Sequence, residues 1–437
     1  MMRTVTQFKQ QKEFEYISIL AAYGLKWEVD GHYLIHRSED QKETSRVYIS
    51  VVCSQISKML SLIGPELVKN DIGFAVVKNA DSAKAILNGT YGPEHVGKVM
   101  ILFLPVHKDH LSERISELLS VFSGPVVPGR LRLGNCLYGN PNPVANISQR
   151  PKVQVLNGKY IALIVLKSVP KGDVIRAIYL NRFMFPVWCI IKEAKYKMIS
   201  DDAGLDMGDR LKWQYRIHEE LSSVVNMPKV IDLFNQDQNT YLVTQHIKGI
   251  TLRKAIDRTY RGKMWFELPC KKRSYLLEIL LDICGMVGQV HDYGYLHRDL
   301  STANFMITKR RKIFLLDWEL AYDQRSENPL PPFGFGTPGF TFPEQGKGVK
   351  PQVKEDIYGL TSLMIAVFTG LRPADMDIAD YDSLFLIIRE RTRESLIAHF
   401  LRRGVSRLAK ERPDIEEIKA FISHIYHNNS NSHTNGN

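Results

Sequence analysis

Cysteine is scarce in this chain of 437 residues, and the cysteines present follow no recognisable pattern. The 5 of them are odd in number and widely spaced, at positions 53, 136, 189, 270 and 284. Zinc sites need closely spaced Cys or His ligands, and a disulfide framework needs an even set of cysteines. The sequence therefore argues against both, and a reducing cytoplasm is the location that we expect.

Long apolar runs are also missing. None approaches the roughly 18 residues of a membrane-spanning helix, so we expect a soluble protein without a membrane span. The first residues, Met1-Met-Arg-Thr-Val-Thr-Gln7, contain no long apolar segment and no small-residue cleavage site. We therefore expect no secretory signal.

Basic residues outnumber acidic ones, 58 against 47, which leaves a formal charge of +11. No stretch alternates basic with aromatic side chains and no nucleic-acid motif is present, so we expect no nucleic-acid partner. Diffuse positive charge suits anionic ligands such as ATP or an acidic peptide, and it equally serves ordinary solubility.

The chain divides into three parts. Residues 1–150 alternate strand-like runs (46–52, 73–77 and 98–104) with helical runs (56–68 and 111–122), which predicts an α+β domain. A Gly/Pro/Asn cluster over 139–146 predicts a boundary, and residues 155–425 form the next part. The polar, low-complexity residues 427–437 predict a disordered tail.

The segment Tyr295-Leu-His-Arg-Asp-Leu-Ser-Thr-Ala-Asn304, followed by Ile313-Phe-Leu-Leu-Asp-Trp-Glu319, carries the strongest chemical signal. Two apolar runs, 305–307 and 313–316, are separated by a charged turn and predict a hairpin. That hairpin places Asn304 beside Asp317, where two oxygen ligands could hold Mg²⁺ against a triphosphate. Asp299 would then face the acceptor hydroxyl.

This segment resembles the catalytic core of protein kinases, with Asp317-Trp-Glu319 where the family usually has Asp-Phe-Gly. The resemblance implies a two-lobed fold, with a β-rich lobe before a helical lobe, that uses ATP and Mg²⁺. It also implies that Asp299 is the catalytic base and that Asn304 and Asp317 bind the metal.

Three downstream features agree with the kinase resemblance. Residues 336–344, Gly-Thr-Pro-Gly-Phe-Thr-Phe-Pro-Glu, resemble the end of a kinase activation segment. Asp356 resembles the residue that anchors the catalytic loop from a buried helix. Arg412 is the implied partner of Glu344, because a buried carboxylate needs a cation. We expect these residues to be structural.

A smaller β-rich lobe is predicted from three strand-like runs, 161–167, 174–180 and 187–192. Lys171 and Gly172 lie in the turn after the first run, where backbone N–H groups could contact phosphate, although this is no Gly-x-Gly-x-x-Gly loop. By resemblance, Lys192 contacts the α- and β-phosphates. Thr244 would lie behind the adenine, and the backbone from Gln245 to Ile247 would bond its edge.

The lysine of a kinase normally pairs with a glutamate on the following helix, here predicted over 209–220. Our alignment places Gln214 at that position. Glutamine can donate or accept a hydrogen bond but supplies no charge. Glu219 or Glu220 could substitute for the glutamate, although each lies more than one turn later.

Ser301 stands where ordinary Ser/Thr kinases have a lysine, and the full pattern most resembles class III and IV lanthipeptide synthetases. The motifs are Pro170-Lys-Gly-Asp-Val174, Trp188-Cys-Ile-Ile-Lys-Glu-Ala194, Arg210-Leu-Lys-Trp213, Asp317-Trp-Glu319 and Gly336-Thr-Pro-Gly-Phe340. In that family a kinase phosphorylates Ser and Thr of a precursor peptide, a lyase eliminates the phosphate, and a cyclase adds cysteine thiols. No cyclase follows here, so a separate cyclase is expected.

Residues 1–150 resemble the lyase domain of that family more weakly. Tyr48 aligns with its histidine acid and Ala75 with its lysine base, while Lys78 lies three residues away from the base position. Three basic residues are implied phosphopeptide contacts: Arg46, Lys98 and Arg130. Because alanine cannot abstract a proton, we expect a degenerate lyase that binds peptide or phosphopeptide. A working lyase and a plain interaction domain are the alternatives.

The leading hypothesis is a Ser/Thr kinase that acts on a protein or on a precursor peptide rich in Ser and Thr. A full dehydratase, which also eliminates the phosphate, is the second hypothesis. A nucleotide-binding pseudokinase scaffold is the third, because of Gln214, Tyr48 and Ala75. A small-molecule kinase agrees less well with the peptide platform predicted over 336–344.

Overall fold

A computed structural model describes residues 16–38, 44–105, 109–141, 154–201, 203–334, 336–343, 345, 349–378 and 380–431. The contacts within the chain define two compact units. The first comprises Met1–Leu211 with Asp232–Val243, and the second comprises Lys212–Ile231 with Thr244–Asn437. Each unit is described by itself below.

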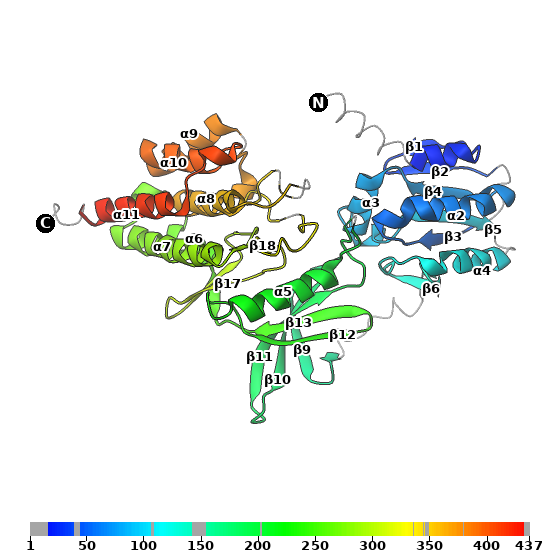
Figure 1. Cartoon of the computed structure of the whole chain (residues 1–437), viewed down its shortest axis with the longest axis horizontal. Helices are drawn as coiled ribbons and strands as arrows, with labels where there is room; N and C mark the ends of the chain where they lie inside the picture. The colour runs from blue at the N-terminus through cyan, green and yellow to red at the C-terminus, as the bar shows by residue number, and fades with distance from the viewer. Residues whose placement is uncertain are drawn as a thin grey trace. The chain divides into compact units, whose positions relative to one another are not determined.

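The first unit begins with a seven-stranded sheet in the order β1-β2-β4-β5-β3-β7-β6 (Figure 1). Its strands are β1 (Glu28–Asp30), β2 (Tyr33–His36), β3 (Thr44–Ile49), β4 (Gly73–Val77), β5 (Met100–Pro105), β6 (Arg130–Gly134) and β7 (Leu137–Pro141). The accompanying helices are α2 (Ile56–Lys69), α3 (Ala80–Leu87) and α4 (Asp109–Leu118). These elements give residues 28–141 the α+β content that the sequence predicted, and a separate domain over residues 1–150 stays a prediction.

The alternation of side chains along β3 gives this sheet two different faces. Ile49 belongs to the main core, which the apolar stripe of α2 helps to fill. Tyr48, its neighbour, points to the opposite face and packs there with Val127 and Tyr138. Because successive residues face opposite ways, the chemistry predicted for Tyr48 belongs to the face away from the main core.

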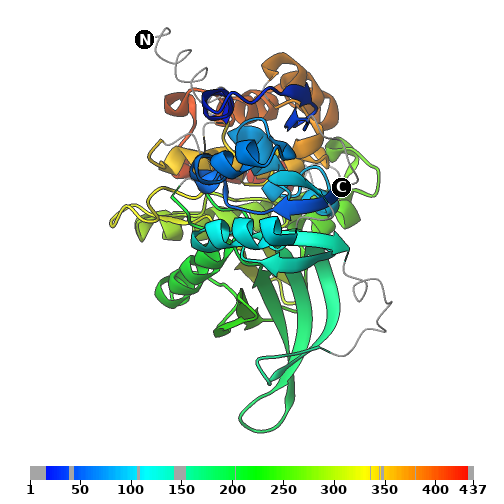
Figure 2. The same cartoon turned by 90° about the vertical axis from the view of Figure 1, so that its right-hand side faces the viewer.

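The second sheet has six strands in the order β12-β13-β11-β10-β9-β8, and its long antiparallel strands stand out in Figure 2. The strands are β8 (Gln154–Leu156), β9 (Tyr160–Val169), β10 (Gly172–Leu180), β11 (Pro186–Ala194), β12 (Val230–Gln236) and β13 (Asn239–Gln245). The three strand-like runs expected between 161 and 192 correspond to β9, β10 and β11.

The second unit is mainly helical. Among the described residues of both units, no helix has the length and apolar content to cross a membrane. Its helices are α5 (Met207–Leu221, which begins in the first unit), α6 (Leu252–Tyr260), α7 (Cys270–Asp292), α8 (Val353–Thr369), α9 (Tyr381–Thr392), α10 (Ser395–Gly404) and α11 (Ile415–Asn431). Short strands complete it: β14 (Gly249–Thr251), β15 (Tyr295–Leu296), β16 (Phe305–Thr308), β17 (Ile313–Leu315) and β18 (Tyr322–Asp323). Short 3₁₀ turns occur in both units: η1 (Cys53–Gln55), η2 (Pro93–His95), η3 (Leu119–Val121), η5 (Trp265–Glu267), η6 (Pro373–Asp375) and η7 (Ala409–Glu411).

The predicted disordered tail is wrong for residues 427–431, which form the last turn and more of α11. The side chain of Asn429 is buried and its Nδ2 donates to the carbonyl oxygen of Cys270 and, at 2.7 Å, to the Oγ of Ser274. Contact with α7 thus stabilises the end of α11, where the polar composition predicted no helix. Residues 432–437, the rest of the predicted tail, lie outside the described residues.

Candidate active site

The hairpin predicted from the sequence is confirmed: β16 pairs antiparallel with β17, with Phe305 opposite Leu315. Just beyond the hairpin ends, the Leu316 N–H donates to the Asn304 carbonyl at 2.8 Å, which brings Asn304 and Asp317 to one place. Asp317 has a φ of 61°, a strained conformation for a residue other than glycine. Such strain is typical of functional positions, where surrounding contacts hold it.

Asp299 is held by a hydrogen bond to each carboxylate oxygen. The Nδ2 of Asn304 donates to its Oδ2 at 2.9 Å, and the backbone N–H of Thr337 donates to its Oδ1 at 2.9 Å. Thr337 belongs to the segment expected to form the peptide platform. The carboxylate is therefore oriented by the catalytic loop on one side and by the platform on the other, as a positioned base requires.

The Asn304 side chain can serve both Asp299 and a metal. Its Nδ2 donates to the carbonyl and to the Oδ2 of Asp299, so Oδ1 is the atom left to face a cation. No three His, Cys, Asp or Glu side chains among the described residues cluster closely enough to bind a metal by themselves. An amide oxygen and one carboxylate fit Mg²⁺ instead, since this ion takes few protein oxygens and completes its shell with phosphate and water.

The tautomer of His297 follows from its two ring contacts. Its Nδ1 accepts the N–H of Asp299 at 3.3 Å, so its Nε2 carries the proton and donates to the carbonyl of Leu316 at 3.0 Å. The ring also packs edge-on against Trp318, with centroids 4.6 Å apart. His297 therefore joins the loop that carries Asp299 to the residue preceding Asp317.

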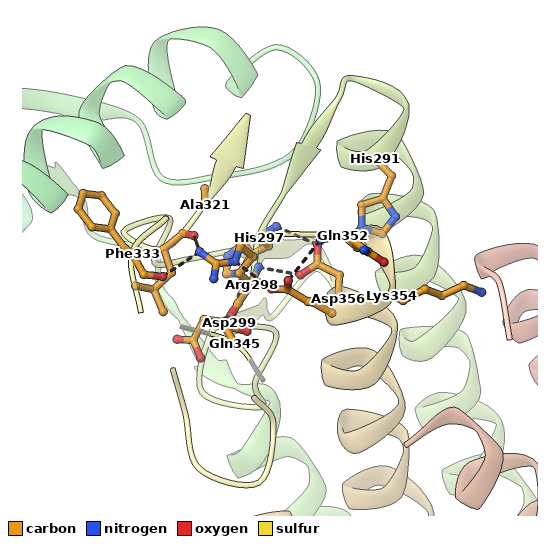
Figure 3. Close-up of polar contacts among 12 residues, drawn as sticks. His291, His297, Arg298, Asp299, Ala321, Phe333, Gln345, Gln352, Lys354 and Asp356 are labelled. Carbon is orange, nitrogen blue, oxygen red and sulfur yellow. Dashed lines mark hydrogen bonds and ion pairs between the residues drawn. The ribbon is translucent and has the colours of Figure 1, made fainter. Parts of the chain in front are cut away.

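Asp356, fully buried on α8, anchors this loop (Figure 3). It accepts the backbone N–H groups of His297 at 2.8 Å and Arg298 at 2.7 Å, and the Nε2 of His291 lies 3.0 Å away. Burial alone would raise the pKa of Asp356, but the contacts with His291 and His297 outweigh it and hold the pKa below its usual value. The predicted structural role of Asp356 agrees with these contacts.

Arg298 is 3% exposed and its guanidinium makes three contacts, of which Figure 3 shows the one with Phe333. Its Nε donates to Glu355 at 3.0 Å, and its Nη1 donates to the carbonyls of Phe333 at 2.8 Å and Leu320 at 3.3 Å. Both carbonyls lie in the segment between Asp317 and the peptide platform. Burial raises the pKa of Glu355, and the charge of Arg298 opposes that effect. One buried arginine thus fastens this segment to the start of α8.

Glu344, the predicted partner of Arg412, lies outside the described residues. Arg412 itself is 2% exposed, and its Nε donates to the carbonyl of Ser406 at 2.8 Å. Its guanidinium stacks over the ring of Phe342, 4.0 Å from the centroid, two residues before Glu344. The structural assignment of Arg412 is compatible with these contacts, and the pairing with Glu344 stays a prediction.

In the first unit, Gly172 and Lys192 lie at one end of the β9–β10–β11 sheet. Lys192 is opposite Val174 on β10, two residues after Gly172. Gly172 has a φ of 147°, and a Cβ there would lie 2.0 Å from the carbonyl oxygen of Glu193, so no side chain fits. Lys171 precedes it in the turn, and its carbonyl accepts the N–H of Lys195. The turn and the lysine expected to contact phosphate are therefore neighbours.

The predicted hinge follows β13. Thr244 and Ile247 are buried, and Gln245 is exposed. The N–H of Gln245 donates to the carbonyl of Lys229 at 2.8 Å, so this residue has only its carbonyl to offer the edge of an adenine. The prediction for the Gln245 backbone is therefore reduced to one hydrogen bond, which its carbonyl would accept from the adenine.

Gln214 is 3% exposed on α5, and its Nε2 lies 3.4 Å from the Nε2 of His218 on the same helix. Glu219 is exposed. Glu220 contacts Arg216 at 3.0 Å and also accepts a hydrogen bond from the hydroxyl of Tyr295. Glu220, a partly buried carboxylate that follows the expected glutamate position on α5, is thus engaged with Tyr295 at the start of the catalytic loop.

The N-terminal sheet aligns the two predicted lyase positions in one row across four strands. Ala75 is opposite Ile101, Ile101 is opposite Tyr48, and Tyr48 is opposite Tyr138. Lys78 lies beyond β4, and its Nζ donates to the carbonyl of Gly31 at 2.9 Å. Lys78 therefore lies outside the row that contains Tyr48 and Ala75.

The implied phosphopeptide contacts gather around Tyr48. The Nζ of Lys98 lies 5.0 Å from its ring centroid, and the guanidinium carbon of Arg130 lies 4.6 Å away. Burial lowers the pKa of Lys98, the charges of Arg130 and Arg46 lower it further, and Glu94 opposes them. Three cations close enough to repel one another form a site suited to an anion.

Sequence reasoning missed the supporting residues of the catalytic loop. The motifs give no indication that Arg298 and Glu355 form a buried ion pair that supports the loop. The contact of the Thr337 backbone with Asp299 had no sequence signal, because any residue supplies an N–H. Ser301 is 1% exposed, and within the described chain its Oγ has no hydrogen-bond partner.

Comparisons with known proteins agree with this geometry. A profile described as the protein kinase domain matches residues 189–433. Calmodulin-binding receptor-like cytoplasmic kinase 3 of Arabidopsis thaliana is 24% identical over 242 residues, which are 48% of this chain and 46% of that protein. Serine/threonine-protein kinase PknB of Mycolicibacterium smegmatis is 23% identical over 192 residues, which are 42% of this chain and 29% of that protein.

Serine/threonine-protein kinase B of Synechocystis sp. is 24% identical over 257 residues, which are 56% of this chain and 42% of that protein. The chain spans less than half the length of these relatives. Among solved structures, the PknI kinase domain of Mycobacterium tuberculosis is 17% identical with a TM-score of 0.44, covering 62% of this chain and 98% of that chain.

Proposed function

This chain belongs to the protein kinase domain family, and from that membership we propose that it is an ATP- and Mg²⁺-dependent kinase of Ser and Thr side chains in a protein or peptide. The family also accounts for the fold, in which a β-rich lobe precedes a helical lobe. The observation that carries the proposal is the set of hydrogen bonds that orients Asp299 from two sides.

Each predicted residue has one role in this proposal. Asp299 accepts the proton of the acceptor hydroxyl, while the Oδ1 of Asn304 and the carboxylate of Asp317 hold Mg²⁺. Lys192 orients the α- and β-phosphates, and the turn at Lys171 and Gly172 contacts them through its backbone. Mg²⁺, when bound, neutralises the charge that develops on the transferred group.

For the nucleotide base, the proposal uses the residues after β13. Thr244 lies behind the adenine, and the carbonyl of Gln245 and the backbone of Ile247 bond its edge. The N–H of Gln245 is engaged with the carbonyl of Lys229, so the carbonyl is the backbone group of Gln245 that this assignment uses. A cytoplasmic location, where ATP is available, belongs to the same proposal.

The substrate class rests on the resemblance to class III and IV lanthipeptide synthetases. We propose a precursor peptide rich in Ser and Thr, and the proposal assigns ring closure to a separate cyclase. Thr337 supports a peptide substrate, because the platform segment that contains it also positions Asp299. A substrate peptide lying on that platform would have its hydroxyl beside the base.

A second candidate function concerns the N-terminal domain. We propose that Arg46, Lys98 and Arg130 bind a phosphorylated Ser or Thr side chain of the peptide. The crowding of these cations around Tyr48 favours this role. Elimination is not proposed as its main activity, because Tyr48 and Ala75 replace the acid and the base that elimination needs.

Mass spectrometry of a treated precursor peptide tests these assignments. The purified chain is incubated with ATP, Mg²⁺ and a peptide rich in Ser, Thr and Cys. A gain of phosphate supports a kinase, and a loss of water shows a full dehydratase. Nucleotide binding without transfer to any peptide would instead support the scaffold and would overturn the kinase proposal.

A further inference from the structure

Helix α5 is attached to the catalytic part of the second unit at two points about two turns apart. At the first, the indole Nε1 of Trp213 donates to the carbonyl oxygen of Ala321 at 2.7 Å. At the second, the carboxylate of Glu220 accepts the hydroxyl hydrogen of Tyr295. These attachments join a helix to residues on either side of the segment that carries Asp299 and Asp317.

The partners of α5 form one small structure. Tyr295 lies on β15, which pairs antiparallel with β18, so Tyr295 is opposite Asp323 and Leu296 is opposite Tyr322. Ala321 directly precedes β18. One attachment point of α5 therefore lies on the two-stranded ladder and the other directly beside it, and this ladder joins the start of the catalytic loop to the residues after Asp317.

The charges around Glu220 are balanced. Arg216 lies 3.0 Å from Glu220, and Arg325 lies 3.6 Å from Glu220 and 3.1 Å from Asp323. The hydrogen bond from Tyr295 lowers the pKa of Glu220, and burial raises the pKa of Tyr295. Two carboxylates and two guanidinium groups thus surround a buried phenol, an arrangement that fixes geometry more than an exposed ion pair does.

In protein kinases the corresponding helix is kept in place by an ion pair with the strand lysine, and this pair must form for catalysis. Here Gln214 stands at the expected glutamate position and supplies no charge. Glu220, a carboxylate further along α5, accepts the hydroxyl of Tyr295, which lies on β15 at the start of the catalytic loop. The helix is therefore attached to the loop that does the chemistry.

We propose that Glu220 and Trp213 are positioning residues, which hold α5 against the β15–β18 ladder and so maintain the orientation of Asp299 and Asp317. This inference rests on the proposed kinase function. It assigns to a carboxylate–phenol contact within one unit the task that a lysine–glutamate ion pair usually performs.

The kinetic test compares Glu220→Ala with Glu219→Ala, an exposed neighbour on the same helix. We expect Glu220→Ala to lower kcat about tenfold and to change KM for ATP less than twofold, because the fraction of molecules with an assembled site falls. Glu219→Ala should match the unmodified chain. Glu220→Gln, whose amide oxygen still accepts from Tyr295, should recover most of the lost kcat.

Tyr295→Phe removes only the hydroxyl and tests the contact from the other side. If Glu220 acts through Tyr295, the double variant Glu220→Ala/Tyr295→Phe should be no slower than the slower single variant. Multiplied effects would overturn the inference, as would an equal loss of kcat in Glu219→Ala.

Hydrogen exchange of the α5 amides gives a readout that is independent of phosphate transfer. Exchange should rise at least fivefold in Glu220→Ala and in Tyr295→Phe, and should stay unchanged in Glu219→Ala. Unchanged exchange in all three variants would overturn the inference even in an active enzyme. If the unmodified chain transfers no phosphate, the proposed function fails, and the exchange result alone decides the role of Glu220.

Discussion

The catalytic loop and the cation cluster around Tyr48 are both suited to phosphate, but they are stabilised in opposite ways. In the catalytic loop, carboxylates meet donors: Asp299 accepts from two groups and Asp356 from three. Around Tyr48, like charges face one another, and the pKa of Lys98 is lowered by burial and by its basic neighbours.

The difference is the one that we expect between the proposed site of phosphate transfer and the proposed phosphopeptide-binding site. A reaction needs groups whose orientation is fixed before the substrate arrives, and internal hydrogen bonds provide that orientation. A binding site for an anion can instead leave cations to repel one another, since the arriving charge relieves the repulsion. The proposed alignment, which puts Tyr48 and Ala75 at the positions of the lyase acid and base, agrees with this division.

The largest effect is expected from Asp299→Asn. The amide keeps the size of the side chain but cannot accept a proton, so phosphate transfer should fall about a thousandfold. The affinity for ATP, measured by calorimetry, should change less than twofold because Asp299 faces the acceptor. Unchanged phosphate transfer would show that Asp299 is not the catalytic base. The proposed difference in role between the catalytic loop and the cluster around Tyr48 would then fail.

Asp356→Asn tests the support beneath the loop. Replacing a buried carboxylate that holds two backbone N–H groups and His291 should lower the free energy of unfolding of the helical part by about 3 kcal/mol. Chemical denaturation would measure this change. Asp282→Asn, at an exposed position on α7, should be neutral and serves as the matched control.

The difference in stability between the unmodified chain and Asp356→Asn has a predictable pH dependence. The pKa of Asp356 is lower in the folded chain than in the unfolded chain, where it is about 3.9. Its contribution to stability is therefore complete above the unfolded pKa and is lost as the pH falls through the folded pKa. A stability difference between the unmodified chain and Asp356→Asn that grows on acidification would contradict the assignment.

Arg130→Ala and Lys98→Ala test the binding site. Each should weaken the binding of a phosphothreonine peptide about tenfold, because a charge-assisted hydrogen bond contributes about 1.5 kcal/mol. Fluorescence anisotropy with the phosphorylated and unphosphorylated peptides would measure the difference. Lys78→Ala is the control, since Lys78 bonds the Gly31 carbonyl away from the Tyr48 row.

The smallest effect is expected from Glu94→Gln. Glu94 is exposed and is the carboxylate that opposes the lowered pKa of Lys98. Removing its charge should strengthen phosphopeptide binding about twofold, a size typical of exposed charges. Weaker binding in Glu94→Gln would indicate that the phosphate does not sit beside Lys98.

Much of this site could be predicted because its chemistry is local in the sequence. The apolar runs around a charged turn predicted the β16–β17 hairpin, and the hairpin in turn predicted the meeting of Asn304 and Asp317. Likewise, the helix that the kinase resemblance predicts over 209–220 corresponds to α5. In each case the spacing along the chain sets the geometry.

Other features had no local signal. The polar composition of residues 427–431 predicted disorder, but contacts of Asn429 with α7 extend α11. The contact of Arg298 with Glu355 joins residues 57 positions apart, and that of Glu220 with Tyr295 joins residues 75 apart. Motif spacing cannot predict such pairs, because the fold of the whole chain decides which distant residues become neighbours.

The sequence by itself determined the catalytic residue types, their order and the elements that carry them, because hydrophobic periodicity and short spacings act over a few residues. Tertiary structure alone decided that Glu220 contacts the catalytic loop, that Ala75 shares a row with Tyr48, and that Arg298 is buried. These outcomes depend on which surfaces pack together, and packing is a property of the folded chain as a whole.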